Sequence, residues 1–210
     1  MVTLNLEDIR SKKCTFCDHS LHQQRIVAQT ERFYAIPTVG QISDGGHMLI
    51  IPKRHYNCLA SLGPGPFNEF EELTARIKGA IENVYGKTVS FEHGILGQSV
   101  PHAHLQILPS GDLSSRIEQD FKLKVQLKQT RDIKDIFTKK GVYLYYRDPS
   151  NNEYAYILDH FPQYLRHVAA QVAGKPDRGD WRAWREDPAH ASFDDELMMQ
   201  TVSKLKQALK

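Results

Sequence analysis

The chain is organised around the stretch Gln98-Ser99-Val100-Pro101-His102-Ala103-His104-Leu105-Gln106-Ile107-Leu108-Pro109. With the two-residue period of a strand, both histidines and Gln106 lie on one face, and the alternate apolar residues lie on the other. Polar side chains buried without partners would each cost about 1–3 kcal/mol. We therefore interpret the stretch as a buried strand that presents His102, His104 and Gln106 to a site. The alternative is a half-exposed strand with incidental polar residues.

The spacing His-x-His-x-Gln resembles the signature of the histidine-triad (HIT) superfamily, which is His-x-His-x-His followed by apolar residues. With Gln106 in the third position, the stretch resembles the transferase branch of that superfamily, meaning galactose-1-phosphate uridylyltransferase and diadenosine tetraphosphate phosphorylase. It also resembles the C-terminal region of CwfJ-type splicing and lariat-debranching-associated proteins.

Further segments carry the same resemblance. Residues 46–55 look like the superfamily's Gly-His-apolar-Pro-Lys-x-His segment, and residues 97–100 look like its Gly-Gln-Ser-Val loop. Phe91-Glu92-His93-Gly94 is similar to the CwfJ-type version of the preceding strand. The segments that more loosely resemble a second CwfJ C-terminal region are Phe161-Pro162-Gln163, Arg166 and Asp180-Trp181-Arg182.

We expect an α+β fold with a HIT-like antiparallel sheet, one long helix across it, and an appended α/β C-terminal segment. Apolar periodicity predicts a central strand over residues 47–52 and a helix over 67–85, after a break at 63–66. Further strands are predicted at 25–28, 32–36, 88–92, 121–128, 142–146 and 154–158, and further helices at 112–121, 161–172 and 193–209. A soft boundary near residue 110 divides a catalytic, nucleotide-binding domain with a zinc knuckle (1–110) from an appendage packed on it (111–210).

The composition is that of an ordinary globular protein. The chain has 210 residues, of which 40% are hydrophobic and 25% charged, and its net charge of +2 is too small to indicate nucleic acid by itself. No apolar run approaches the ~20 residues that span a bilayer, and residues 1–13 hold no signal-peptide core. We therefore expect a cytoplasmic protein without a membrane partner. Residues 121–140 are rich in lysine and arginine, which indicates either a solvated surface or a positive rim for phosphates.

A Cys-x-x-Cys pair, Cys14 and Cys17, supplies half of a tetrahedral zinc site. His19 and His22 are near in sequence but crowd the same loop. Zinc-bearing superfamily members complete the site with the histidine of Pro-Lys-x-His and the first triad histidine. The ligands that the resemblance implies are Cys14, Cys17, His55 and His102. Four protein ligands would make the metal structural. The alternatives are two reduced surface cysteines or a redox pair.

The superfamily's nucleophile is the middle histidine, which corresponds to His104. A neutral imidazole can attack an α-phosphorus and form a nucleotidyl-histidine intermediate. If His102 binds zinc, His104 is also the only free imidazole on the strand. Gln106 can donate to a phosphate oxygen but cannot shuttle a proton, which favours transfer over hydrolysis. Ser99 resembles the loop serine that contacts the phosphate; the alternative is a serine that bonds its own backbone.

Other candidate substrate contacts surround this strand. The loop holding Gly97 and Gln98 can offer backbone N–H groups as an anion nest. His93 and Lys53 are further candidate phosphate contacts, with a surface role as the alternative for each. Many hydrolase-branch members hold the ribose with an aspartate before the Gly-His segment, but residues 37–40 contain no acid. Either ribose recognition differs or the ligand is not an ordinary mononucleotide.

Together these features predict a nucleotidyl transferase or hydrolase that acts at the α-phosphate of a nucleoside polyphosphate or nucleotide conjugate. The rival is a non-catalytic nucleotide- or RNA-binding partner protein of the CwfJ type, or an adapter held by zinc. RNA is a candidate partner because of the basic segment 121–140. Single-domain relatives are commonly dimers, so a homodimer stays open, although the appended half could occupy the dimer surface.

Overall fold

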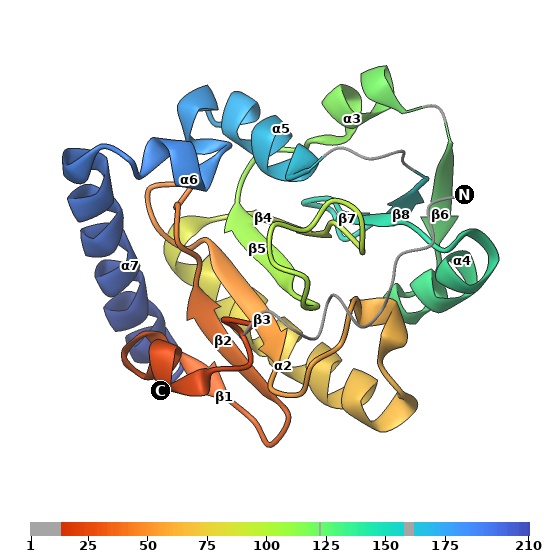
Figure 1. The fold of residues 1–210 in the computed structure, drawn as a ribbon, viewed down its shortest axis with the longest axis horizontal. Helices are drawn as coiled ribbons and strands as arrows, with labels where there is room; N and C mark the ends of the chain where they lie inside the picture. Colours follow the sequence, from red (N-terminus) through yellow and green to blue (C-terminus); the bar gives the residue numbers. More distant parts are fainter. Residues whose placement is uncertain (1–13, 122, 158–161) are drawn as a thin grey trace.

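The computed structural model describes residues 14–121, 123–157 and 162–210. Within them, eight strands form one antiparallel sheet in the order β1-β2-β3-β5-β4-β7-β8-β6 (Figure 1). The strands are β1 (Ala28–Gln29), β2 (Phe33–Pro37), β3 (Met48–Pro52), β4 (Thr88–Glu92), β5 (Leu105–Pro109), β6 (Lys124–Leu127), β7 (Leu144–Arg147) and β8 (Glu153–Tyr156). The predicted α+β class is confirmed.

The long helix α2 (Pro64–Tyr85) covers one face of this sheet. Its buried stripe, which includes Phe70 and Ile77, joins one core cluster with Ile50 of β3 and Leu105 of β5. The helix begins three residues earlier than predicted, because the prolines of residues 63–66 fall in its first turn. There no intrahelical N–H is required, so proline starts a helix rather than breaking it.

The opposite face is covered by two helices from the second half of the chain. In the α3 (Ser114–Asp120) and α5 (Tyr164–Val172) helices, Ile117 and Leu165 cluster with Phe91 of β4 and Leu144 of β7. β7 pairs with β4, so the strands after residue 111 continue the sheet of the first half. The division at residue 110 into two domains stays a prediction.

The remaining helices pack against β2, against α2 and α5, and against one another. The C-terminal helix α7 (Pro188–Ala208) contacts α2 and β2, beside which it runs in Figure 1. It begins five residues before the predicted start, where Asp187 caps it and Pro188 occupies its first position. The other helical segments are α4 (Ile133–Lys140), α6 (Trp181–Trp184), η1 (His19–Arg25), η2 (Leu59–Ser61), η3 (Thr130–Asp132) and η4 (Pro176–Arg178). The sequence patterns did not predict α4.

Over residues 102–107, apolar side chains that face the core alternate with polar side chains that face away from it, as predicted. Ala103, Leu105 and Ile107 join the core beneath α2. Regular strand pairing begins only at Leu105, because Ala103 donates its N–H to the carbonyl of Tyr56 in a loop rather than to a neighbouring strand. β5 lies between β3 and β4, so Gln106 is in the middle of the sheet, on the face opposite α2.

None of the described helices combines the length and apolar character that crossing a bilayer requires. Several predictions concern residues 1–13, 122 and 158–161, which lie outside the described residues. They include the absence of a signal-peptide core, the end of the 154–158 strand and the start of the 161–172 helix at Phe161.

Candidate functional site

His104 is held in one tautomer by the backbone. Its Nδ1 lies 2.7 Å from the carbonyl oxygen of His102, and only a protonated nitrogen can pair with a carbonyl. Nε2 has no hydrogen-bond partner among the residues that the structure describes. Burial, together with the positive charge of Arg166, lowers the pKa of His104 to about 4. The ring is therefore neutral at physiological pH, with an unshared electron pair on Nε2.

The four residues that the resemblance implied as metal ligands lie together. One ligand atom from each of Cys14, Cys17, His55 and His102 falls within a group whose members are all within 4.8 Å of one another. Nδ1 of His102 is 3.4 Å from the Cys14 sulfur and 3.6 Å from the Cys17 sulfur, and Nδ1 of His55 is 3.4 Å from the Cys17 sulfur.

These distances fit a tetrahedral zinc ion. Zinc bonds of about 2.3 Å to sulfur and about 2.0–2.1 Å to nitrogen give sulfur-to-nitrogen edges of roughly 3.5 Å. Nε2 of His102 donates to the carbonyl oxygen of Pro52 at 2.8 Å, which leaves Nδ1 unprotonated and aimed at the cysteines. His19 and His22 instead donate to backbone carbonyls, those of Lys53 and Thr15. The donor set is therefore compatible with zinc.

The Cys14–Cys17 turn also forms one wall of the site. Phe16, inside this turn, packs edge-on against His104, with ring centroids 5.4 Å apart. The turn is tied to β2, because the hydroxyl of Tyr34 donates to the carbonyl oxygen of Phe16 at 2.9 Å. The metal cluster and the free imidazole thus share Phe16 as a neighbour.

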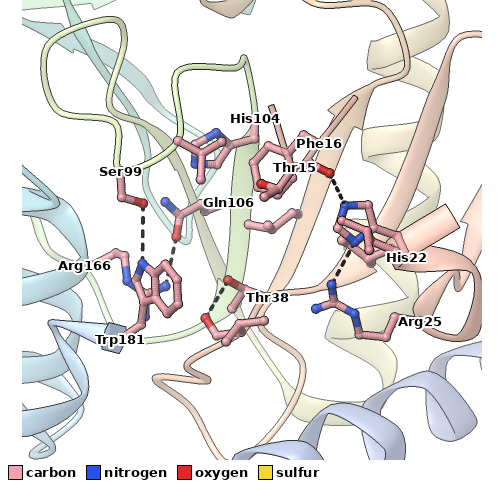
Figure 2. A pocket seen from close by; sticks show the side chains of 15 residues that line it. Thr15, Phe16, His22, Arg25, Thr38, Ser99, His104, Gln106, Arg166 and Trp181 are labelled. Carbon is pink, nitrogen blue, oxygen red and sulfur yellow. Dashed lines mark hydrogen bonds between the residues drawn. The ribbon is translucent and has the colours of Figure 1, made fainter. Parts of the chain in front are cut away.

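A cavity of about 280 Å³ opens in front of His104 (Figure 2). Its lining residues are Thr15, Phe16, Leu21, His22, Arg25, Ile36, Thr38, Val39, Leu49, Ser99, Val100, His104, Gln106, Arg166 and Trp181. Most of its surface is apolar, and none of the lining residues is acidic. A pocket of this size that combines apolar walls with a few polar groups is typical of a small-ligand site.

Arg166 of α5 reaches this cavity and is only 3% exposed. Its guanidinium donates to backbone carbonyls, at 2.7 Å to that of Gly40 and at 3.3 Å to that of Gly179, and lies 3.5 Å from Oε1 of Gln106. Within the described ranges no carboxylate forms an ion pair with it. Burial lowers the pKa of Arg166 to about 10. Among the described residues, this buried cation therefore has no direct ion-pair partner, and Asp194 and Asp180 act on it only through space.

Gln106 turns its carbonyl toward donors. Besides facing Arg166, its Oε1 lies 3.1 Å from Nε2 of the fully buried His47. Its amide nitrogen lies 3.4 Å from Nδ1 of His93. Both Arg166 and His47 need an acceptor here, which fixes this orientation of the amide. In this arrangement Oε1 of Gln106 is engaged by Arg166 and His47, and Arg166 is a charged donor beside Gln106 in the cavity. The role of Gln106 as a phosphate donor stays a prediction.

The loop before β5 is held by the C-terminal half. Nε1 of Trp181 lies 3.5 Å from the hydroxyl oxygen of Ser99, and both residues line the cavity. The guanidinium of Arg182 donates to the carbonyl of Ser99 at 3.1 Å. Gln163 donates its N–H to the carbonyl of Gly97 at 2.9 Å. The predicted serine is thus brought to the cavity, next to a tryptophan from far along the chain.

Three other candidate contacts lie away from the cavity surface. Gln98 turns its amide to the carbonyl of Asn57, at 2.7 Å. His93 is buried, and its Nε2 lies 3.1 Å from the backbone nitrogen of Leu165. Lys53 donates to the carbonyl of Thr30 at 2.6 Å and lines a separate pocket. Their roles as substrate contacts stay predictions.

Sequence reasoning missed Arg166, Trp181 and Arg25 as lining residues. Arg166 and Trp181 entered only as part of a loose resemblance. One signal was available for Arg166: it precedes Ala169 and Ala170 by three and four residues, on the apolar stripe of its helix. A charged residue on a buried stripe is unusual, because burying a charge without a partner is costly.

The basic segment is partly neutralised by neighbouring acids. Lys124 pairs with Glu118 at 2.5 Å, and Arg131 pairs with Glu71 at 2.6 Å. These partly exposed pairs reduce the positive field of residues 121–140 on which an RNA-binding surface would depend.

Comparisons with known proteins agree with the resemblance. Residues 5–122 match the family described as "Protein similar to CwfJ C-terminal". Zinc finger CCCH domain-containing protein 64 of Arabidopsis thaliana is 30% identical over 199 residues, covering 82% of this chain and 32% of that protein. CWF19-like protein 1 of Xenopus laevis is 28% identical over 187 residues, covering 80% of this chain and 34% of that protein. The chain spans about a third of the length of these relatives.

A shorter match and two solved structures complete the comparison. The asymmetrical bis(5'-nucleosyl)-tetraphosphatase of Schizosaccharomyces pombe is 32% identical over 68 residues, covering 30% of this chain and 37% of that protein. A HIT family protein from Bacillus anthracis is 28% identical with a TM-score of 0.42, covering 47% of this chain and 73% of that one. A Zn-bound histidine triad family protein from Mycobacterium smegmatis is 25% identical with a TM-score of 0.40, covering 46% and 74%.

Proposed function

The chain belongs to the family of proteins similar to the CwfJ C-terminal region, and we propose that it is a nucleotidyl transferase or hydrolase. The substrate is a nucleoside polyphosphate or nucleotide conjugate, attacked at its α-phosphorus. The observation that carries this proposal is the Nδ1–H of His104 on the carbonyl of His102, which leaves Nε2 as a free nucleophile beside a cavity.

The reaction has two displacements. Nε2 of His104 forms a bond to the α-phosphorus while the bond to the leaving-group oxygen breaks, and that oxygen carries away the electron pair and takes up a proton from water. The phosphorus–nitrogen bond then breaks when the oxygen of water or of an acceptor hydroxyl attacks, and the attacking group loses its proton to water. The first displacement uses the free Nε2 of His104, and the second restores the neutral tautomer.

Arg166 supplies the positive charge for the phosphoryl oxygens. A guanidinium held in advance by carbonyl groups stabilises developing negative charge without reorganising during the reaction. In this scheme Gln106 is a positioning residue, whose Oε1 orients Arg166 and His47. Ser99, which lines the same cavity, is the hydroxyl donor to the phosphate.

Zinc is the second part of the proposal. Cys14, Cys17, His55 and His102 would hold one zinc ion as a structural centre with all four positions taken by protein atoms. Its contribution is to fix the turn that carries Phe16 and the backbone that fixes the tautomer of His104. Elemental analysis of the purified protein should find one zinc per chain, and a protein that is active without metal would contradict this part.

The test of the reaction is a covalent adduct. The protein is incubated with labelled nucleoside triphosphates, dinucleoside polyphosphates and nucleotide sugars, and an acid-labile nucleotidyl adduct is expected. The adduct should disappear in His104→Asn and persist in His190→Asn, a control at an exposed histidine outside the cavity. If no substrate gives an adduct and the protein binds RNA tightly, the binding-protein function is favoured instead.

A further inference from the structure

A second arginine lines the cavity on the side away from Arg166. Figure 2 shows Arg25 and Arg166 at opposite sides of the pocket, with His104 and Gln106 nearer to Arg166. Arg25 comes from the end of η1, and Arg166 from α5, so the two guanidiniums are brought there by unrelated parts of the chain.

Arg25 is oriented but not neutralised. One of its terminal nitrogens donates to Nδ1 of His22 at 2.8 Å, and the other makes only long contacts, 3.5 Å to the carbonyl of Pro37 and 3.7 Å to the sulfur of Met198. Within the described ranges no carboxylate lies within ion-pair distance of Arg25. The nearby Asp194 is occupied by Arg185 and by the backbone N–H groups of residues 40 and 41.

His22 acts as a fixed support for this guanidinium. Its Nε2 donates to the carbonyl of Thr15 at 2.9 Å, so its Nδ1 is an acceptor and is available to Arg25. The His22 ring stacks on Tyr34 at an interplanar angle of 21°. Because the only acceptor nitrogen of the buried His22 bonds Arg25, the guanidinium is preorganised, as expected for a binding residue.

The charge pattern of the cavity indicates the ligand. Two guanidiniums without carboxylate partners face a space whose lining residues include no acid. Arg166 is buried and Arg25 is half-buried, and Asp194 acts on both only through space. Holding such cations away from water is unfavourable unless an anion accompanies them. In the proposed reaction, the α-phosphate lies at His104 and Arg166. Besides the phosphates of the leaving group, the other position on a nucleotide that can carry phosphate is a ribose hydroxyl.

We propose that Arg25 forms a second anion subsite, which binds a phosphate on the ribose of the nucleotide whose 5'-phosphate lies at His104. The substrate class is then a nucleotide with a phosphate on its ribose and the leaving group of the proposed reaction on its 5'-phosphate, either as a free molecule or as the 5'-terminal nucleotide of an RNA strand. The bisphosphate without a leaving group is the corresponding product and serves as the binding probe. This inference rests on the proposed function, since it assumes a nucleotide at His104.

The test compares ligands first, in the unmodified protein. Calorimetry measures the affinity of 5'-monophosphates of the four nucleosides and of the matching 3',5'- and 2',5'-bisphosphates. A charge-assisted contact at Arg25 should make a bisphosphate roughly ten- to a hundredfold tighter. Equal affinities would overturn the inference while leaving the proposed function intact. If no nucleotide binds, the proposed function fails and the inference fails with it.

Variants then assign the difference to Arg25. The gap in affinity between mono- and bisphosphate should close in Arg25→Gln, persist at least partly in Arg25→Lys, and remain in Arg116→Gln, which removes a half-exposed charge outside the cavity. A gap that survives Arg25→Gln in a protein with an unchanged melting temperature would contradict the subsite. A 5'-phosphorylated dinucleotide that binds as tightly as the bisphosphate would identify an RNA end as the source, and one that is excluded would identify the free bisphosphate.

Discussion

The carbonyl oxygen of His102 accepts a hydrogen bond from Nδ1 of His104 at 2.7 Å. Because Nδ1 of His102 itself lies in the cysteine–histidine cluster, the residue that would bind metal also sets the tautomer of the proposed nucleophile. His102 and His104 are two residues apart and lie on one face of the strand. The side chain of His102 would bind the metal, while its backbone carbonyl orients the imidazole of His104 for attack.

Removal of metal should therefore affect both stability and chemistry. Because a structural ion binds the folded state and not the unfolded chain, a chelator should lower the melting temperature of the protein. Adduct formation at His104 should fall in parallel, since Phe16 packs on that ring. The melting temperature of Cys17→Ser should be lower at the start and should not respond to chelator. A wild-type protein indifferent to chelator would remove the zinc proposal.

Gln106→Glu tests the orientation of the amide. The change keeps the shape of the side chain but sets a carboxylate against Arg166 and His47. Arg166 would then be neutralised, so affinity for nucleotides should fall roughly tenfold or more while the melting temperature is retained. Gln171→Glu makes the same charge change at an exposed position of α5, the helix that carries Arg166, and should leave nucleotide affinity unaltered. Unaltered affinity in Gln106→Glu would show that Arg166 does not bind the phosphate.

The buried Glu92 should give stability a distinctive dependence on pH. Burial raises the pKa of Glu92 to about 8, although the Tyr143 hydroxyl and the N–H of Leu59 donate to its carboxyl group. In the unfolded chain its pKa is about 4.3. Between these values the folded protein keeps a proton that the unfolded chain has lost. The free energy of unfolding contributed by this group therefore falls as pH rises, by about 1.4 kcal/mol per pH unit.

Glu92→Gln should remove that slope, because the amide cannot ionise. Denaturant unfolding at pH 5 and pH 8 should show the wild-type protein losing more stability over this range than the variant. Buried histidines such as His47, whose pKa is lowered, act in the opposite direction in both proteins, so the difference between the two isolates Glu92. The same pH response in both proteins would mean that Glu92 is ionised in the folded state.

Two glycines provide a matched pair for backbone geometry. Gly40 has φ of +73°, and a Cβ there would lie 2.3 Å from Cβ of Trp181. Since its carbonyl also anchors Arg166, Gly40→Ala should cost at least about 1–3 kcal/mol and weaken nucleotide binding. Gly79, inside α2, has open space around it, so Gly79→Ala should stabilise the protein by about 1 kcal/mol. Thermal and denaturant unfolding measure both, and equal effects would contradict the contact with Trp181.

Much of the fold could be predicted because its patterns are local. The alternation over residues 102–108 places the same residues under α2 that the structure buries there, and the stripe of residues 67–85 identifies the long helix. Its start could not be predicted, since proline and glycine mark both a chain break and a helical first turn. The α4 helix was missed because its short amphipathic pattern lies in a run of charged residues.

By itself, the sequence determined which residues of the 102–107 stretch face the core and that His102, His104 and Gln106 share the other face. It also determined that Cys14 and Cys17 lie at metal-binding spacing. Only the tertiary structure decided what surrounds them. Arg166 and Trp181 reach the cavity from the second half of the chain, and Arg25 enters from the opposite side. Periodicity records which face of an element is buried, but the electrostatics of a cavity depend on which distant charges the fold brings to it without a countercharge.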